Sequence, residues 1–191
     1  MSALALQALS CDRLGLKGPR AEAWLNANGI TLPAKPNTWK SADGASADAL
    51  LVARLGTGEF FLEEGAGGTI LKRLAPVLDE GLPGVYPVMR EDWAFHLGGE
   101  GVHDVLAQVC NVNFAALPLD SRPLIMTLMI GVAVLVVPQD GAGGQNGGAG
   151  RDDPAGRRYR IWCDPTFGPY LGASLGAVVV ECGGSYTGAC G

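Results

Sequence analysis

The side chains best suited to chemistry gather around two histidines, His96 and His103, the only histidines in the chain. Asp104 follows His103 directly, Gln108 lies nearby on an expected helix, and Cys110 comes seven residues after His103. Imidazole, thiolate and carboxylate groups bind zinc, which usually takes four such ligands. A site here would need one or two more ligands, and Cys110 continues an apolar stripe. We therefore interpret Cys110 as a core residue on the same helix side as His103, and predict no metal site.

No pattern of an active site accompanies these residues. The sequence has no Ser-His-Asp order, paired carboxylate motif or nucleophile elbow. A catalytic cysteine needs a cationic neighbour to lower its pKa, and none can be assigned to Cys110. Cys182 and Cys190 lie among glycines near the C-terminus, which leaves a redox role open for them. We predict no catalytic residue, and the sequence names no cofactor-binding residue.

A glycine-rich insertion at 139–157, centred on 141–150, could suggest a phosphate-binding loop. It lacks both the Gly-Lys-Ser/Thr ending and the G-x-G-x-x-G spacing that such loops use. We interpret it as a flexible loop between two strands. Its flanks carry charged residues that keep it solvated: Arg151, Asp152, Asp153, Arg157 and Arg158.

Two tryptophans could stack on a cofactor, Trp24 and Trp162. Trp24 lies in an expected helix and Trp162 in an expected strand. Large aromatic side chains in such places most often anchor a core or an interface. We predict that role for both, with cofactor stacking as the alternative.

The elements that carry these residues begin with the segment 95–114, which predicts a strand, a glycine turn and a helix. Its apolar residues recur at i, i+3, i+4 and i+7, which places them on one helix face: Val102, Val105, Leu106 and Val109. The segment 14–25 has the same pattern, with Gly18 aligned on Gly99. The chain therefore looks like one unit used twice.

A second pair of segments supports the duplication. Residues 59–70 align with 160–171, so that Glu59 matches Arg160 and Leu74 matches Leu175. The offset is 81 residues in the first block and 101 in the second, so the second copy carries 20 more residues (101 − 81 = 20). The glycine-rich insertion accounts for them.

The full pattern predicts an α+β fold made of two pseudo-repeated β-α-β-β-α-β units. In the first half we expect strands at 14–16, 49–55, 59–62 and 85–89, with helices after Pro19 and over 70–78. In the second half we expect strands at 94–97, within 125–137, at 159–163 and at 177–181. Asp164 and Pro165 should cap a last helix whose residues face one way: Phe167, Tyr170, Leu171 and Leu175.

The domain boundaries follow from this pattern. We expect an N-terminal arm at 1–13, a first pseudo-repeat at 14–90, a second at 91–182 and a flexible tail at 183–191. Together they should form one compact domain. A fold of 191 residues with 48% apolar content can bury a sizeable core.

The composition limits the partners. Charged residues make up only 17% of the chain, against roughly a quarter in ordinary soluble domains, which favours a surface covered by partner subunits. The net charge is −5 and the basic residues are scattered, which argues against nucleic acid. The longest apolar run, 124–138, is shorter than the ~18 residues of a membrane-spanning helix, so we expect no membrane partner. The five cysteines have no disulfide or zinc spacing, which favours the cytoplasm.

These residues resemble the gamma subunit of heterotetrameric sarcosine oxidase and the corresponding small subunit of N-methylglutamate dehydrogenase. The resemblance runs from Arg13 to about Glu181 and is carried by four segments: 16–25, 55–62, 105–114 and 159–171. It implies a fold similar to the folate-binding domain of the glycine-cleavage aminomethyltransferase. It also implies that FAD, FMN, NAD and tetrahydrofolate lie on larger flavoprotein subunits, which oxidise an N-methyl amine.

The resulting hypothesis is a non-catalytic, gamma-type subunit of a flavin-dependent, tetrahydrofolate-linked amine-oxidising complex. No residue matches the acidic residue that grips folate in the aminomethyltransferases. Two alternatives remain open at this point. One is a stand-alone folate-binding or aminomethyltransferase-like protein, and the other is a structural assembly protein.

Overall fold

The computed structural model describes residues 3–41, 49–139 and 157–188. The chain forms two compact units, each of which is described by itself. Unit 1 comprises Met1–Leu9, Asp92–Asp120 and Ile125–Gly191, and unit 2 comprises Ser10–Glu91 and Ser121–Leu124. The sequence predicts one compact domain with an arm that ends at residue 13. The structure instead assigns the first nine residues to the same unit as the second half of the chain.

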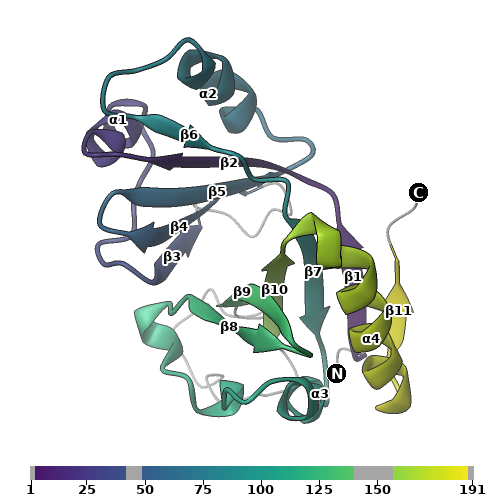
Figure 1. The fold of residues 1–191 in the computed structure, drawn as a ribbon. Coiled ribbons are helices and arrows are strands. Elements are labelled where there is room, and N and C mark those ends of the chain that lie inside the picture. Colours follow the sequence, from purple (N-terminus) through teal and green to yellow (C-terminus); the bar gives the residue numbers. More distant parts are fainter. Residues whose placement is uncertain (1–2, 42–48, 140–156, 189–191) are drawn as a thin grey trace. The chain divides into compact units, whose positions relative to one another are not determined.

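The described residues form a mixed α+β fold (Figure 1). The helices are α1 (Ala21–Ala27), α2 (Ile70–Asp79), α3 (Val102–Val109) and α4 (Gly168–Glu181), with short 3-10 turns η1 (Phe114–Ala116), η2 (Leu119–Ser121) and η4 (Pro165–Phe167). The strands are β1 (Ala5–Leu9), β2 (Cys11–Lys17), β3 (Thr38–Ser41), β4 (Leu51–Gly56), β5 (Glu59–Gly65), β6 (Tyr86–Val88), β7 (Trp93–Gly98), β8 (Ile125–Met129), β9 (Val132–Gln139), β10 (Arg158–Cys163) and β11 (Ser185–Thr187).

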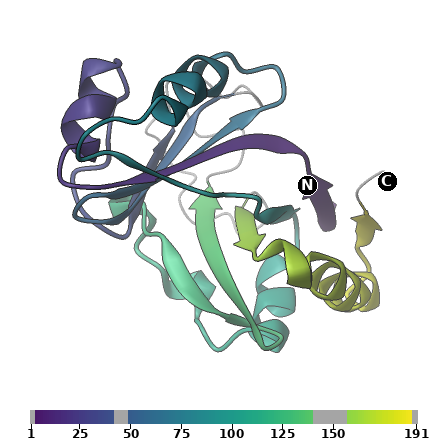
Figure 2. The ribbon, with the colours of Figure 1, turned by 45° about the horizontal axis from the view of Figure 1, so that its top comes forward.

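Unit 2 contains a five-stranded antiparallel sheet in the order β3-β4-β5-β2-β6. Helices α1 and α2 cover one face of this sheet (Figure 2). Side chains alternate between the two faces of a strand, so every second residue reaches the helices. The core on this face includes Leu16, Phe60 and Leu62 from the strands and Leu25 and Leu74 from the helices.

Unit 1 contains a six-stranded sheet in the order β11-β1-β7-β10-β9-β8. Strands β1 and β11 are parallel, and all other neighbours are antiparallel. Its core joins the sheet to α3 and α4 through Phe95, Ile161, Val105, Leu175 and others. The apolar stripe predicted for α3 is buried in this core, so that prediction is confirmed.

Several expected elements lie where the pattern places them. Strands β4 and β5 form the predicted hairpin around Thr57 and Gly58, and α2 ends before Gly81. Strands β6, β7 and β10 match the expected strands within one or two residues. Asp164 accepts a hydrogen bond from the backbone N–H of Thr166 at 2.8 Å, which confirms the cap before the last helix.

The expected arm and flexible tail both contain strands. Residues 5–9 form β1, which pairs with β7 on one side and with β11 on the other. Residues 185–187 of the tail form β11. These predictions were wrong because both partners lie about 90 residues or more from β1, and local pattern carries no signal of such long-range pairing.

The apolar run 125–137 is a hairpin of two strands, β8 and β9, rather than one strand. The turn consists of Ile130 and Gly131, both with positive φ (50° and 80°). Two-residue turns of this kind usually carry Asn-Gly or Asp-Gly. An isoleucine at the first position hides the signal.

The strand expected at 177–181 is the last part of α4. Valines at 178–180 favour strands locally, but Leu171, Leu175 and Val179 recur every four residues and are fully buried. The predicted facing of this helix also needs correction, because Phe167 and Tyr170 are exposed while Leu171 and Leu175 are buried.

Each unit has a glycine corner where a strand leads directly into a helix, β2 into α1 in unit 2 and β7 into α3 in unit 1. Gly18 has φ +136°, and a Cβ there would lie 2.3 Å from the carbonyl oxygen of Gly84, just before β6. Gly99 has φ +108°, and a Cβ there would lie 2.2 Å from the carbonyl oxygen of Ala3, just before β1. Both corners therefore require glycine.

The strand pairs of each sheet show how the residues of unit 2 align with those of unit 1. Lys17 pairs with Glu59 in unit 2, and Gly98 pairs with Arg158 in unit 1. When Gly18 is aligned on Gly99, the matched strands differ by 99 residues (158 − 59 = 99), whereas the sequence alignment predicts 101. A shift of two residues keeps every side chain on the same sheet face, so the apolar pattern could not separate the two registers.

Candidate functional site

The two histidines lie on different elements and do not form a joint site. His96 lies on β7, directly opposite Arg160 of β10. Its pKa is lowered to about 4 by burial and by the charges of Arg160 and Arg158. His103 lies on α3. His96 is therefore a neutral side chain at pH 7, held next to two guanidinium groups.

His103 contacts a buried tyrosine of β10. Its Nε2 lies 2.7 Å from the hydroxyl of Tyr159, and the ring of Phe114 packs edge-on against the tyrosine ring. Burial lowers the pKa of His103, and the charge of Arg157 lowers it further. Burial raises the pKa of Tyr159, opposed by a hydrogen bond and the charge of Arg157. Both groups are thus neutral at pH 7, and the contact satisfies a buried hydroxyl without a ready proton transfer.

The structure does not bring the cysteines together with His103 in one site. Helix α3 ends at Val109, and Cys110 is extended, so the expected shared helix face was wrong. Cys110 is buried in the core of unit 1, as predicted, with its Sγ 3.6 Å from the Oγ1 of Thr127. Cys163 is also buried, and burial together with the charges of Asp92 and Asp164 raises its pKa to about 11. Cys163 is therefore a poor nucleophile at neutral pH.

The remaining predicted residues are divided between exposed and undescribed parts of the chain. Cys182 is exposed and accepts a hydrogen bond from Gln108 at 3.3 Å. Cys190 and residues 140–156 of the glycine-rich insertion lie outside the described residues. Within the ranges 3–41, 49–139 and 157–188, no three metal-binding side chains come together.

The two tryptophans belong to different units. Trp162 is 1% exposed, on β10 of unit 1, and Trp24 packs partly buried against the core of unit 2. The burial of both side chains fits the predicted role as anchors of a core or an interface.

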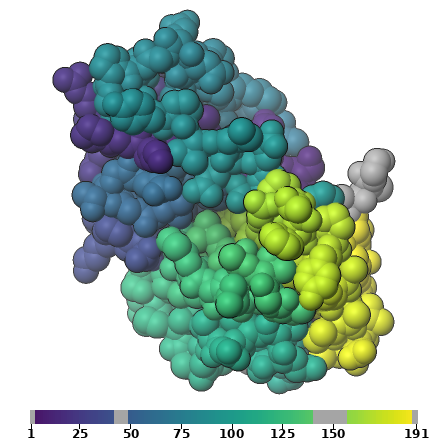
Figure 3. Space-filling model, viewed as in Figure 1, coloured from purple at the N-terminus to yellow at the C-terminus, as the bar shows by residue number. Residues whose placement is uncertain are grey.

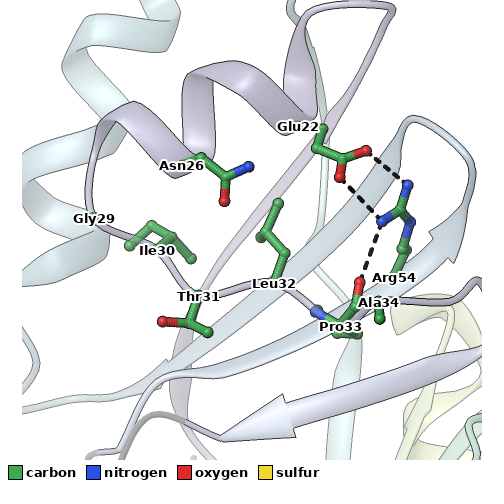
Figure 4. A pocket seen from close by; sticks show the side chains of 9 residues that line it. All are labelled: Glu22, Asn26, Gly29, Ile30, Thr31, Leu32, Pro33, Ala34 and Arg54. Carbon is green, nitrogen blue, oxygen red and sulfur yellow. Dashed lines mark hydrogen bonds and ion pairs between the residues drawn. The ribbon is translucent and has the colours of Figure 1, made fainter.

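A pocket of about 630 Å³ lies in unit 2 (Figure 4). It is bounded by α1, by the segment that follows α1, and by Arg54 of β4. The lining residues are Glu22, Asn26, Gly29, Ile30, Thr31, Leu32, Pro33, Ala34 and Arg54. Its volume lies in the range of small-molecule sites, about 300–1,000 Å³.

The one cation of this pocket, Arg54, is fully used by the protein. Its Nη1 and Nη2 donate to the carboxylate of Glu22 at 3.4 and 2.8 Å, and to the carbonyl oxygens of Pro33 and Thr57 at 3.2 and 2.8 Å. Its Nε donates to the carbonyl of Gly56 at 3.3 Å. A guanidinium has five N–H donors, and these five bonds occupy them. Arg54 therefore joins α1 to the β4–β5 turn and leaves no donor for an anionic ligand.

A second charged group inside unit 2 is also structural. The carboxylate of Glu64, on β5, accepts hydrogen bonds from the backbone N–H groups of Ile70 and Leu71 at 3.2 and 2.9 Å. These are two of the four N–H groups that a helix leaves unpaired at its start. Glu64 thus caps α2 in place of Thr69, which makes no side-chain cap.

Sequence reasoning missed both Arg54 and the His103–Tyr159 pair. Arg54 could have been found, because a lone arginine inside the apolar segment 49–55 indicates a buried, paired cation. Tyr159 gave no comparable signal, since an aromatic residue at the start of a strand is ordinary.

No protein-family model and no curated protein sequence matches the chain. Its fold is similar to that of a chain in the heterotetrameric sarcosine oxidase from Corynebacterium sp. U-96, solved in complex with pyrrole 2-carboxylate. The TM-score is 0.64 at 21% identity, over 92% of this chain and 83% of that chain.

The fold is also similar to the glycine cleavage system aminomethyltransferase T from Bartonella henselae. Here the TM-score is 0.63 at 16% identity, over 97% of this chain and 48% of that chain. The chain thus spans about half the length of the aminomethyltransferase. Both likenesses are likenesses of fold, and they confirm the fold resemblance that the sequence indicated. No helix within the described ranges is long and apolar enough to cross a membrane.

Proposed function

We propose that this chain is a non-catalytic, gamma-type subunit of a flavin-dependent, tetrahydrofolate-linked amine-oxidising complex of the sarcosine oxidase kind. The observation that carries the proposal is the extent of the fold match. It covers most of this chain and most of a chain from a heterotetrameric enzyme, whereas the aminomethyltransferase needs about twice the length.

The chemistry of the described side chains is consistent with a non-catalytic role. The guanidinium of Arg54 has no free donor, the His103–Tyr159 pair is neutral at pH 7, and Cys163 has a raised pKa. On this proposal FAD, FMN, NAD and tetrahydrofolate bind to larger partner subunits in the cytoplasm.

A duplicated unit is part of the same proposal. The order β3-β4-β5-β2-β6 of unit 2 corresponds to β8-β9-β10-β7-β1 of unit 1, with β11 added at the edge. The corner glycines Gly18 and Gly99 occupy matching places in the two orders. These parallels support two copies of one ancestral sheet, with boundaries near residues 14–90 and 91–182, except that β1 (Ala5–Leu9) supplies to the second copy the strand that corresponds to β6.

The test is co-purification from cells that express the tagged chain together with the reading frames flanking its gene. We expect a large subunit with flavin absorbance to elute with the chain in a fixed ratio. A chain that elutes alone, with every flanking frame expressed and soluble, contradicts the proposal.

The pocket beside Arg54 is the observation behind a second candidate, a folate-binding protein that works alone and holds its ligand without a donor from Arg54. Its volume of about 630 Å³ would admit a ligand of that size, and the aminomethyltransferase shares the fold. Calorimetry with tetrahydrofolate on the isolated chain separates the two candidates. Micromolar binding that is lost in Asn26→Trp, which fills the pocket, favours this second function.

A further inference from the structure

Three basic side chains lie together on one face of the unit 1 sheet. Helices α3 and α4 cover the other face, and in Figure 3 the yellow-green atoms of α4 lie at the molecular surface. Phe95 of β7 and Tyr159 of β10 belong to the core on the helix side. Side chains alternate along a strand, so His96, Arg158 and Arg160 lie on the face opposite the helices. We call these three residues the basic cluster of unit 1.

The strand pairing brings the members of the basic cluster close together. Arg160 of β10 lies directly opposite His96 of β7, and Arg158 lies opposite Gly98. Gly98 has no side chain, and a Cβ there would lie 3.0 Å from the Cγ of Arg158. The side chain of Arg158 therefore leans towards β7. The charges agree with this placement, because both arginines lower the pKa of His96.

Two members of the basic cluster have unused hydrogen-bonding groups. The side chains of His96 and Arg158 make no hydrogen bond or ion pair with any residue that the structure describes. Both side chains are half-buried, so each has lost part of its hydration. A guanidinium carries five N–H donors, and a neutral imidazole carries one. Because a partly dehydrated charge is costly without a counter-charge, the cluster favours a bound anion.

Unit 2 shows how the same place is filled when the chain supplies both charges. In the alignment of the two sheets, Glu59 corresponds to Arg158, and Phe61 corresponds to Arg160. The Nη2 of Arg90 lies 3.6 Å from the carboxylate of Glu59, and its guanidinium lies over the Phe61 ring at 5.3 Å. Unit 2 thus places one cation against a carboxylate and a ring. Unit 1 has an arginine at both of these partner positions, so the matching carboxylate is missing from its sheet.

We propose that the basic cluster of unit 1 binds a small oxyanion, a phosphate or carboxylate group, with the guanidinium of Arg158 as the main donor. The planar fork of a guanidinium binds both kinds of group through two parallel hydrogen bonds. The neutral ring of His96 supplies one further N–H. An uncharged ligand is disfavoured, because it would bring no charge to offset that of the arginines. This inference does not depend on the function proposed above.

The two histidines give the test a direct signal and an internal control. The chain has no other histidine, so His96→Gln and His103→Gln assign the two sets of ring-proton resonances. Proton NMR follows both rings against pH in sodium chloride, sodium phosphate and sodium formate at one ionic strength. Equal ionic strength separates binding from the screening of the arginine charges. Each variant is compared with itself in chloride.

We expect phosphate or formate to raise the pKa of His96 from about 4 to about 5 or higher, because a bound negative charge favours the protonated ring. The pKa of His103 should not change. Arg158→Gln should remove most of this rise, whereas Lys72→Gln, at an exposed cation of unit 2, should keep it. At pH 7 the same anion should raise the melting temperature of the wild type and not that of Arg158→Gln.

The inference is wrong if neither anion changes the pKa of His96 or the melting temperature relative to chloride. It is also wrong if Arg158→Gln responds to the anions as the wild type does, because the binding then lies elsewhere. A pKa of His96 near 6.5 in chloride alone would show that the chain itself supplies the counter-charge, which also overturns the inference. If only one of the two anions acts, and does so through Arg158, that anion identifies the class of ligand.

Discussion

Gly18 and Gly99 occupy the same corner in their respective units, but the strands that they face have different origins. Gly18 faces Gly84, two residues before β6, which comes from the same half of the chain. Gly99 faces Ala3, two residues before β1, which comes from the N-terminal segment. The difference teaches that each sheet needs an antiparallel strand at this place, and that a segment distant in sequence can supply it. Strand β1 (Ala5–Leu9) is therefore part of the fold of unit 1.

The largest effect is expected at the corner of unit 1. Gly99→Ala should lower the free energy of unfolding by more than about 3 kcal/mol, because a Cβ there meets the backbone of Ala3 and the positive φ adds strain. Urea unfolding measures the change. Gly29→Ala is the control, since Gly29 has φ +79° with nothing within 4 Å of its Cβ, and should cost about 1 kcal/mol. Equal costs for the two would show that β1 does not approach the corner.

A second difference concerns the middle of the two strands that lead into these corners, β2 and β7. Strand pairing aligns His96 of β7 with Gly15 of β2. The pKa of His96 is lowered from 6.5 to about 4, so the unfolded chain binds a proton that the folded chain does not. Stability is therefore fully present above pH 6.5 and falls as the pH drops towards 4, by up to about 3 kcal/mol.

His96→Gln tests this effect, because glutamine does not titrate. Chemical denaturation at pH 7 and pH 4.5 should show a smaller loss of stability for the variant than for the wild type. His103→Gln should change the pH dependence less. A wild-type and a His96→Gln protein with the same pH profile would mean that His96 is not held neutral by its arginine neighbours.

The comparison extends to the aromatic residues that pair with the end of these strands. Phe60 of β5 aligns with Tyr159 of β10, and both are fully buried. The guanidinium of Arg54 lies over the Phe60 ring at 5.3 Å, whereas His103 contacts the Tyr159 hydroxyl. The buried aromatic ring is therefore contacted by a charged side chain in unit 2 and by a neutral side chain in unit 1.

Arg54→Met should destabilise the chain by about 2 kcal/mol, because it leaves several carbonyl groups without donors while keeping the apolar stem. Thermal and urea unfolding give the value. Arg73→Met, on the exposed side of α2, should change stability by no more than about 0.5 kcal/mol. A small effect of Arg54→Met would show that packing, and not the hydrogen bonds of Arg54, stabilises this region.

Tyr159→Phe gives unit 1 the residue found in unit 2 and should cost only about 1 kcal/mol, the net value of one hydrogen bond. Tyr86→Phe, at a tyrosine that is 54% exposed, should be neutral. If Tyr159→Phe costs far more stability than Arg54→Met, the polar contact in unit 1 would contribute more to stability than the one in unit 2, contrary to this expectation.

The sequence predicts those parts of the fold whose signal is local. The stripe of α3, the turn at Thr57 and Gly58 and the Asp164 cap depend on neighbours within a few residues, and all three were found. Strand β1 was missed because its partners are distant. The end of α4 was missed because Val178 to Val180 favour a strand until Leu171 and Leu175 are counted with them.

The candidate site was less predictable than the fold. The individual histidines and cysteines were visible, but only the three-dimensional structure shows that His103 contacts Tyr159 and that Cys110 does not share its face. Contacts of this kind join β10 to α3, 56 positions apart, and side-chain type alone does not specify them.

The placement of β1 in unit 1 also affects the order of events on the ribosome. Ala5–Leu9 leaves the exit tunnel before the rest of both units, but its neighbours β7 and β11 are made only after almost all of unit 2. Unit 2 can therefore begin to fold during translation, while the leading strand waits with unpaired backbone groups. A nascent chain in that state exposes a strand edge that promotes misassembly, and it would benefit from chaperones or prompt capture by its own C-terminal half.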